Sequence, residues 1–308
     1  MYYYSAFGLT IASEPELPQL NAVVDLSGER LDADIQVRIK DLSDADPGCF
    51  AVAEESRIIQ REKDRICYDR KEIGRFEIIN GRFINIHPYE GISDDTLSLF
   101  IMGRCMGCVF AQRGIFALHG SCVCRDGKAI VICGHSGAGK STLASEFLSR
   151  GWKLMADDIT VIQKKSDVFC AVSSFPAQKL WKDAIDYYEY DSGRITPLMK
   201  ERSTAKYHVD ITGSFYEGIT PIAAIIHISP REWEFSFSEY LGVKKVQRIL
   251  KDVYLHRGLY DDEADRTVIQ TALELAKNTR VFFAVRNNRR DCSRQTYEHI
   301  IEAITTEE

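Results

Sequence analysis

The stretch GHSGAGKST at residues 134–142 restricts the possible folds of this 308-residue chain more than any other segment. It satisfies the pattern G-x-x-x-x-G-K-[ST], follows the apolar run AIVIC and opens the amphipathic run KSTLASEFLSR. The motif therefore predicts a buried strand, a phosphate-binding loop and a helix in immediate succession. We expect the whole stretch to bind phosphate, that is Gly134, His135, Ser136, Gly137, Ala138, Gly139, Lys140, Ser141 and Thr142.

The residue types of this loop suit a nucleoside triphosphate bound together with magnesium. Glycines let backbone N–H groups turn toward phosphate oxygens, and the N-terminus of the helix adds unpaired N–H groups and a favourable dipole. Lys140 supplies positive charge to the β and γ phosphates, and the Ser141 hydroxyl is a ligand for Mg²⁺. ATP and Mg²⁺ are therefore the expected cofactors. A glycine-rich helix entry without a ligand would not explain Lys140.

Two adjacent carboxylates, Asp157 and Asp158, follow after one helix and one short strand, in the segment GWKLMADDITVI. Apolar residues on both sides predict that at least one carboxylate points into a site. Beside a triphosphate, one can hold Mg²⁺ and the other can accept the proton of an attacking hydroxyl. We assign the metal to Ser141 and Asp158 and the proton to Asp157, and the reverse assignment stays open. A solvated turn is the alternative, because Asp-Asp also suits turns.

A hairpin upstream of the loop predicts the place of a histidine. Asp126-Gly127 is a strong signal for a two-residue hairpin turn. Its register, continued along both strands, puts His119 opposite Gly134. A bulge would break this register, and a histidine satisfied within the core is the alternative. We expect His119 to act in catalysis by placing an aspartate or the γ-phosphate.

The chain divides into a β-rich part and an α/β part. Residues 1–92 hold short β-forming segments between turn residues, with the hairpin dipeptide Asn80-Gly81 among them, which predicts a small antiparallel sheet. Apolar residues at helical spacing predict a bridging helix over 93–113, capped by Ser93. From 114 to 308, strand-like and helix-like segments alternate. This pattern predicts an α/β domain, and α+β for the chain overall.

Composition argues against several classes of protein. The net charge of −6 is a poor match to a nucleic-acid binder, although Arg286, Arg289 and Arg290 could form a local basic patch. We expect no signal peptide and no membrane span, because no suitable apolar run is present. Nine scattered cysteines suit the reducing cytoplasm. Zinc at Cys105-x-x-Cys108 or Cys122-x-Cys124 is the weaker alternative, since no second pair stands at zinc-finger spacing.

The segments LHGSCV, GHSGAGKST and RGWKLMADD, between residues 118 and 162, resemble the catalytic core of bacterial HPr kinase/phosphorylase. That family shares a P-loop architecture with phosphoenolpyruvate carboxykinase. The wider chain resembles HPr-kinase-like proteins encoded with lasso-peptide biosynthesis, through YSAFGLTIASEPELPQL, FPAQKLW and a lysine that we place at Lys206. The resemblance implies a serine kinase whose acceptor is the C-terminal serine of a precursor peptide. His119, Lys140, Ser141, Asp157 and Asp158 carry over as its site residues.

The chain departs from HPr kinases after the aspartates, where no counterpart of their RGLGI signature follows. This departure argues against HPr as the substrate and against the reverse phosphorylase activity. The expected partner is a ribosomally made peptide, which the β-rich domain could recognise by strand addition. We expect neither nucleic acid nor a membrane as partner, and an oligomer is compatible with the sequence.

The sequence also offers further cations for the site and leaves two other functions open. Lys179, Arg202 and Lys206 are candidates to neutralise the transition state, and Trp181 could line a substrate groove or lie in the core. A nucleotide-driven ATPase that acts on a partner and a kinase of small molecules are the alternative functions. Both would use the same loop and the same aspartates.

Overall fold

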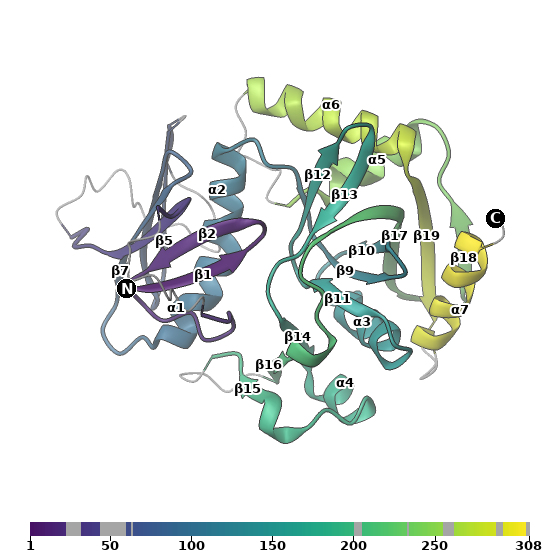
Figure 1. Cartoon of the computed structure of the whole chain (residues 1–308), viewed down its shortest axis with the longest axis horizontal. Coiled ribbons are helices and arrows are strands. Elements are labelled where there is room, and N and C mark those ends of the chain that lie inside the picture. Colours follow the sequence, from purple (N-terminus) through teal and green to yellow (C-terminus); the bar gives the residue numbers. More distant parts are fainter. Residues whose placement is uncertain are drawn as a thin grey trace. The chain divides into compact units, whose positions relative to one another are not determined.

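The computed structural model describes residues 1–22, 32–43, 60–62, 64–199, 205–232, 234–254, 262–287 and 292–305. The chain forms two compact units (Figure 1). The first unit contains Met1–Ile115 with 197–204 and 255–267. The second contains Phe116–Thr196, Ala205–Tyr254 and Val268–Glu308.

A seven-stranded sheet in the order β1-β2-β3-β7-β6-β5-β4 forms the body of the first unit. Its strands are β1 (Tyr2–Ala6), β2 (Leu9–Ser13), β3 (Ile35–Ile39), β4 (Gln60–Glu62), β5 (Arg65–Arg70), β6 (Gly74–Ile79) and β7 (Phe83–Pro88). The predicted hairpin between β6 and β7 is confirmed. Asn80 and Gly81 both have positive φ angles, and the Arg82 N–H donates to the Ile79 carbonyl at 3.0 Å.

The prediction of an antiparallel sheet is wrong at β3, which pairs in parallel with both β2 and β7. The sequence pattern identifies a strand from its own residues. The direction of its partner depends on how the connections run, which that pattern does not encode. Residues 44–59, within the region predicted to be rich in β-strands, lie outside the described residues.

The predicted helix over 93–113 forms as α1 (Asp94–Phe100), a π-helical turn η2 (Ile101–Cys105) and α2 (Met106–Gln112). The Ser93 hydroxyl accepts a hydrogen bond from the Thr96 N–H, so the predicted cap is confirmed. The helix packs on the sheet of the first unit, where the Phe110 ring lies 5.2 Å from the Phe7 ring. It is therefore part of that unit.

The cysteine pairs that could have bound zinc lie in apolar surroundings. Cys105 and Cys108 are buried in the helix, and Cys122 and Cys124 are buried in a strand. Burial raises the pKa of the Cys105 thiol to about 12 and that of Cys124 to about 11. Across the described ranges, no three His, Cys, Asp or Glu side chains gather in a way that could hold a metal ion.

The second unit contains a nine-stranded mixed sheet and a smaller one. The large sheet runs β11-β9-β10-β17-β13-β12-β8, and β19 pairs with β17 and β18. Its strands are β8 (Ala117–Leu118), β9 (Gly120–Arg125), β10 (Lys128–Gly134), β11 (Lys153–Ala156), β12 (Thr160–Lys165), β13 (Val168–Val172), β17 (Ile219–Glu232), β18 (Ser236–Glu239) and β19 (Arg280–Asn287). The small sheet is β14 (Ala177–Trp181), β16 (Lys206–Asp210) and β15 (Ile195–Pro197).

Helices alternate with these strands along the chain, which confirms the predicted mixed α/β class. They are α3 (Lys140–Ser149), α4 (Lys182–Tyr187), α5 (Val243–Asp252), α6 (Asp262–Asn278) and α7 (Cys292–Thr305), with short 3₁₀ turns η3 (Ser192–Arg194) and η4 (Thr212–Ser214). In the part of the chain that the structure describes, no helix is both long enough and apolar enough to cross a membrane.

The core of the second unit anchors the phosphate-loop motif at both ends. Strand β10 is paired with β9 on one side and with β17 on the other, and Ile130 and Ile132 are fully buried. Helix α3 follows the loop and buries Phe147, whose ring lies 5.0 Å from Trp152 and 4.8 Å from Tyr297 of α7. The loop therefore joins two elements that are packed into the same core.

Candidate active site

The motif GHSGAGKST lies where the sequence predicts it, between β10 and α3. Gly134, Gly137 and Gly139 have φ angles of 151°, 80° and 92°, a region that favours glycine. A Cβ at Gly134 would lie 2.5 Å from the Ile228 carbonyl oxygen. The loop borders a cavity of about 710 Å³, whose wall includes seven of the nine predicted phosphate-binding residues, namely Ser136, Gly137, Ala138, Gly139, Lys140, Ser141 and Thr142. Gly134 and His135 do not line it.

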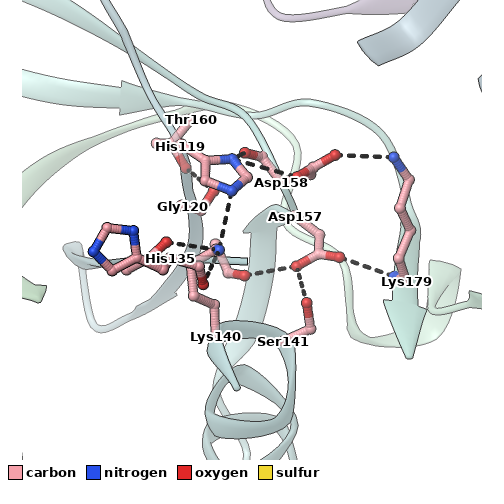
Figure 2. Close-up of polar contacts among 11 residues, drawn as sticks. His119, Gly120, His135, Lys140, Ser141, Asp157, Asp158, Thr160 and Lys179 are labelled. Atoms are coloured by element: carbon pink, nitrogen blue, oxygen red, sulfur yellow. Dashed lines mark hydrogen bonds and ion pairs between the residues drawn. The ribbon is translucent and has the colours of Figure 1, made fainter. Parts of the chain in front are cut away.

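The Lys140 side chain is held inside the loop by three contacts (Figure 2). Its Nζ donates to the carbonyls of Gly134 at 2.9 Å and His135 at 3.2 Å, and lies 3.1 Å from His119 Nε2. Burial lowers the pKa of Lys140, and the nearby Asp158 and Asp157 carboxylates offset this only in part. His135 thus binds Lys140 through its backbone carbonyl, while its own side chain is exposed.

His119 reaches the loop from just beyond the predicted hairpin. The turn at Asp126-Gly127 forms, and β9 pairs with β10 in the predicted register as far as Gly120. The strand pairing ends there, so the predicted pairing of His119 with Gly134 is not formed. The imidazole nevertheless lies beside the loop, because its Nε2 contacts the Lys140 ammonium.

The last residue of α5 and the two residues after it hold the backbone on either side of His119. The His119 N–H donates to the Asp252 carbonyl at 2.7 Å, and the Tyr254 N–H donates to the Ala117 carbonyl at 2.9 Å. An isolated bridge joins Leu118 to Val253 between these two hydrogen bonds. This short pairing fixes the position from which the imidazole extends.

Asp157 is bound to the phosphate loop and is only 6% exposed. Its Oδ1 accepts hydrogen bonds from the hydroxyls of Ser121 at 2.6 Å and Ser141 at 2.9 Å (Figure 2). Its Oδ2 accepts the backbone N–H of Lys179 at 2.8 Å. The carboxylate therefore lies next to the Ser141 hydroxyl, the group that binds Mg²⁺ in loops of this motif.

The Asp158 carboxylate contacts different groups from those that bind Asp157, because the chain turns there with a positive φ of 73°. Its Oδ2 lies 3.0 Å from Lys179 Nζ, and its Oδ1 lies 3.4 Å from His119 Nδ1. The Gly120 N–H donates to the Asp158 carbonyl at 3.2 Å, which ties the turn to β9. The Asp158 side chain is 31% exposed and lines the cavity, so an incoming group can reach it.

The charges around Asp158 keep it ionised. Burial alone raises the pKa of this carboxyl, but the Lys179 ammonium, which also donates a hydrogen bond to it, and the Lys206 charge outweigh that effect and hold its pKa well below the usual range. Burial and the Lys140 charge lower the pKa of His119, so the imidazole is neutral at pH 7. Since Lys140 donates to its Nε2, the proton of the neutral ring lies on Nδ1 and faces Asp158.

Replacing His119 by glutamine is expected to reduce the loss of stability on acidification. Folding lowers the pKa of His119, so the unfolded chain binds more protons between the folded-state pKa and about 6.5. The stability that depends on the neutral ring is complete above about pH 6.5 and is lost as the pH falls through the folded-state pKa of His119. The measurement is the free energy of unfolding of the wild type and His119→Gln at about pH 7.5 and about pH 5.5. Equal losses in both proteins would contradict the expectation.

Of the other residues that the sequence suggests for the site, some line the cavity and some lie outside the described residues. Lys179, Trp181 and Lys206 all line the cavity. Trp181 is 50% exposed, so the alternative that it lies in the core is wrong. Its cross-strand partner is Lys206, whose Nζ lies 5.6 Å from the indole ring. Arg202, Arg289 and Arg290 lie outside the described residues.

Two residues of the site are missed by the sequence analysis. Ser121 binds Asp157, and the signal for it is its place two residues after His119, on the same face of an extended segment. Arg286 is allowed by the sequence as part of a surface patch, but it is 1% exposed and lines the cavity beside the phosphate loop. No sequence pattern distinguishes it from a surface arginine at the end of a strand.

Comparison with known proteins gives matches to parts of the chain. Residues 89–188, less than half of the chain, match the family model described as SynChlorMet cassette protein ScmC. A segment of 50 residues is 50% identical to a protein of Oceanobacillus iheyensis that carries the provisional name HPr kinase/phosphorylase 2. This match covers 16% of the present chain and 16% of that protein. The similarity to HPr kinase/phosphorylase is thus established for a short segment, and neither match bears on the lasso-peptide subgroup.

A solved structure is similar over a longer stretch but only distantly. The Hpr(Ser) kinase/phosphatase from Coxiella burnetii aligns with 61% of this chain and 92% of its own, at 11% sequence identity and a TM-score of 0.33. A TM-score this low carries no argument about fold or function.

Proposed function

We propose that this chain is an ATP-dependent kinase that transfers the γ-phosphoryl group of ATP to a serine hydroxyl. One observation carries the proposal: an ionised carboxylate, Asp158, faces the same cavity as the phosphate loop. A site built only to hold a nucleotide has no need of a second, accessible carboxylate close to the triphosphate. A site that accepts a proton from an attacking hydroxyl needs one. The short HPr kinase/phosphorylase-like segment supports the same reaction class.

The contacts of the two aspartates lead us to exchange the roles that the sequence analysis assigns. Ser141, the loop hydroxyl suited to Mg²⁺, donates to Asp157 and not to Asp158 within the described contacts. The oxygen atoms of Ser141 and Asp157 are the hard ligands that Mg²⁺ prefers. We therefore propose that these two residues hold Mg²⁺, which when bound neutralises charge on the β and γ phosphates. Asp158 is left to act on the acceptor.

The proposed step needs little covalent chemistry from the protein. The serine oxygen attacks the γ phosphorus, the bond from that phosphorus to the β–γ bridging oxygen breaks, and ADP leaves. Asp158 accepts the serine proton, while His119 and Lys179 hold its carboxylate in place. Lys140 stabilises negative charge on the phosphates. Most of the rate would come from positioning and charge neutralisation.

We further propose a peptide acceptor, namely a ribosomally made precursor that ends in serine. The support is the resemblance of the opening segment and of FPAQKLW to kinases encoded with lasso-peptide biosynthesis. Trp181, at the end of that second segment, lines the cavity and exposes half of its surface. An exposed indole in the cavity wall is a suitable contact for a peptide side chain.

The test is mass spectrometry of such a peptide after incubation with the protein and Mg·ATP, beside a peptide whose last serine is alanine. We expect one or more phosphate groups on the first peptide and none on the second. Phosphate on neither, with steady release of inorganic phosphate, would favour the ATPase. Phosphate on neither peptide, with turnover of a metabolite hydroxyl, would favour the small-molecule kinase. Either outcome contradicts the peptide acceptor.

A further inference from the structure

A buried arginine lies against the phosphate loop and has no part in the proposed transfer step. Arg286, on β19, is 1% exposed and lines the cavity. Its Nη1 donates to the carbonyls of Ala138 at 2.6 Å and Gly139 at 3.4 Å. Its Nη2 donates to the Ser293 hydroxyl at 2.9 Å, in the first turn of α7. A guanidinium is costly to bury, so a role for it in the loop is worth seeking.

The contacts of Arg286 fix which way the peptide planes of the loop face. In a trans peptide, the C=O and the N–H point in opposite directions. Where Arg286 binds the Ala138 carbonyl, the N–H of Gly139 in the same plane must point away from the guanidinium. The Gly139 carbonyl accepts the Leu143 N–H of α3 at 2.9 Å as well as Arg286 at 3.4 Å, so helix and arginine together direct the Lys140 N–H. Arg286 therefore orients the Gly139 N–H and supports the orientation of the Lys140 N–H, two of the groups that such a loop offers to phosphate.

Lys140 acts in the same way at the other end of the loop. Its Nζ binds the carbonyls of Gly134 and His135, and so turns the N–H groups of His135 and Ser136 away from itself. Carbonyls at both ends of the loop are thus bound by cations. This arrangement keeps negative carbonyl dipoles occupied and leaves N–H groups for an anion.

The space around Gly139 agrees with this role of Arg286. Gly139 has a φ of 92°, and a Cβ built on it would lie 2.0 Å from Arg286 Nη1. The guanidinium therefore occupies the volume that a side chain at this position would need. Glycine at 139 is required by the arginine as well as by the backbone angle.

We propose that Arg286 is a positioning residue, which holds the C-terminal end of the phosphate loop in its anion-binding conformation and adds fixed positive charge to the cavity wall. Ser293 orients the guanidinium fork from α7. The inference rests on the proposed binding of a triphosphate by the loop, but it does not depend on which group accepts the phosphoryl.

The test measures binding of inorganic triphosphate with Mg²⁺ to the full chain by titration calorimetry. We expect Arg286→Lys to raise the Kd about tenfold with unchanged stoichiometry, because a lysine is a point charge and cannot span two carbonyls and Ser293. Ser293→Ala keeps the guanidinium and should raise the Kd by about threefold. The matched control is Arg280→Lys on the same strand. Arg280 binds the Ala303 carbonyl at 2.8 Å and Glu239 at 2.8 Å, and it does not line the cavity.

Several outcomes would overturn the inference. A merely structural role would lower the stoichiometry by reducing the folded fraction and would leave the Kd of the remaining protein unchanged. Unchanged Kd values in both Arg286→Lys and Ser293→Ala would also overturn the inference. If the lysine variant does not fold, the Kd of Ser293→Ala alone tests it. A wild type that binds triphosphate but transfers no phosphoryl group would remove the kinase proposal alone. A wild type that binds no triphosphate would remove both.

Discussion

Replacing Asp158 by asparagine is expected to slow phosphoryl transfer by about 10³-fold, within the range of about 10²–10⁴ for a general base. The amide has nearly the same shape but cannot accept the serine proton. Binding of ATP should be unchanged or tighter, because the variant removes a negative charge next to Lys140 and Lys179. The measurements are kcat from peptide phosphorylation and the Kd of Mg·ATP.

The matched comparison is Asp157→Asn, which changes the neighbouring carboxylate in the same way. Because Asp157 binds Ser141, we expect this variant to need more Mg²⁺ for half-maximal rate, and to recover activity as Mg²⁺ is raised. Asp158→Asn should stay inactive at any Mg²⁺ concentration. If Asp158→Asn were the variant rescued by Mg²⁺, the original assignment of the metal to Asp158 would return.

Replacing Lys140 by methionine is expected to weaken triphosphate binding and to lower kcat/KM by about 10²–10³-fold, the usual effect of removing one preorganised charge from such a site. Methionine keeps the length of the side chain but removes its charge. It also frees the carbonyls of Gly134 and His135, so their peptide planes lose the orientation that favours an anion. The measurements are the Kd of Mg·ATP and kcat/KM for the peptide.

A lysine on the same domain serves as the control for that change. Lys164 is paired with Glu274 at 2.9 Å and does not line the cavity, so Lys164→Met should leave ATP binding within about twofold of the wild type, as expected for an exposed ion pair. Wild-type binding by Lys140→Met would contradict the assignment of the phosphate site to this loop.

Much of the second unit could be predicted from local residue patterns. The glycines, Lys140 and the apolar run before them specify a strand, a loop and a helix through interactions between near neighbours in the chain. The turn at Asp126-Gly127 likewise needs only two residues that tolerate positive φ, and it forms. Local chemistry also predicted an early pair of carboxylates near the loop. These features depend on few residues close in sequence, so the sequence determined them.

Only the tertiary structure decided which side chain faces which. The contacts of Asp157 and Asp158 differ because the backbone turns with a positive φ between strands, a detail that two identical adjacent residues do not reveal. The partners of His119 depend on where β9 stops pairing and on a segment more than a hundred residues away in the chain. Arg286 meets the loop because β17 lies between β10 and β19 in the folded sheet and pairs with both. Contacts of this kind arise from packing between distant segments, and no local pattern in the sequence encodes them.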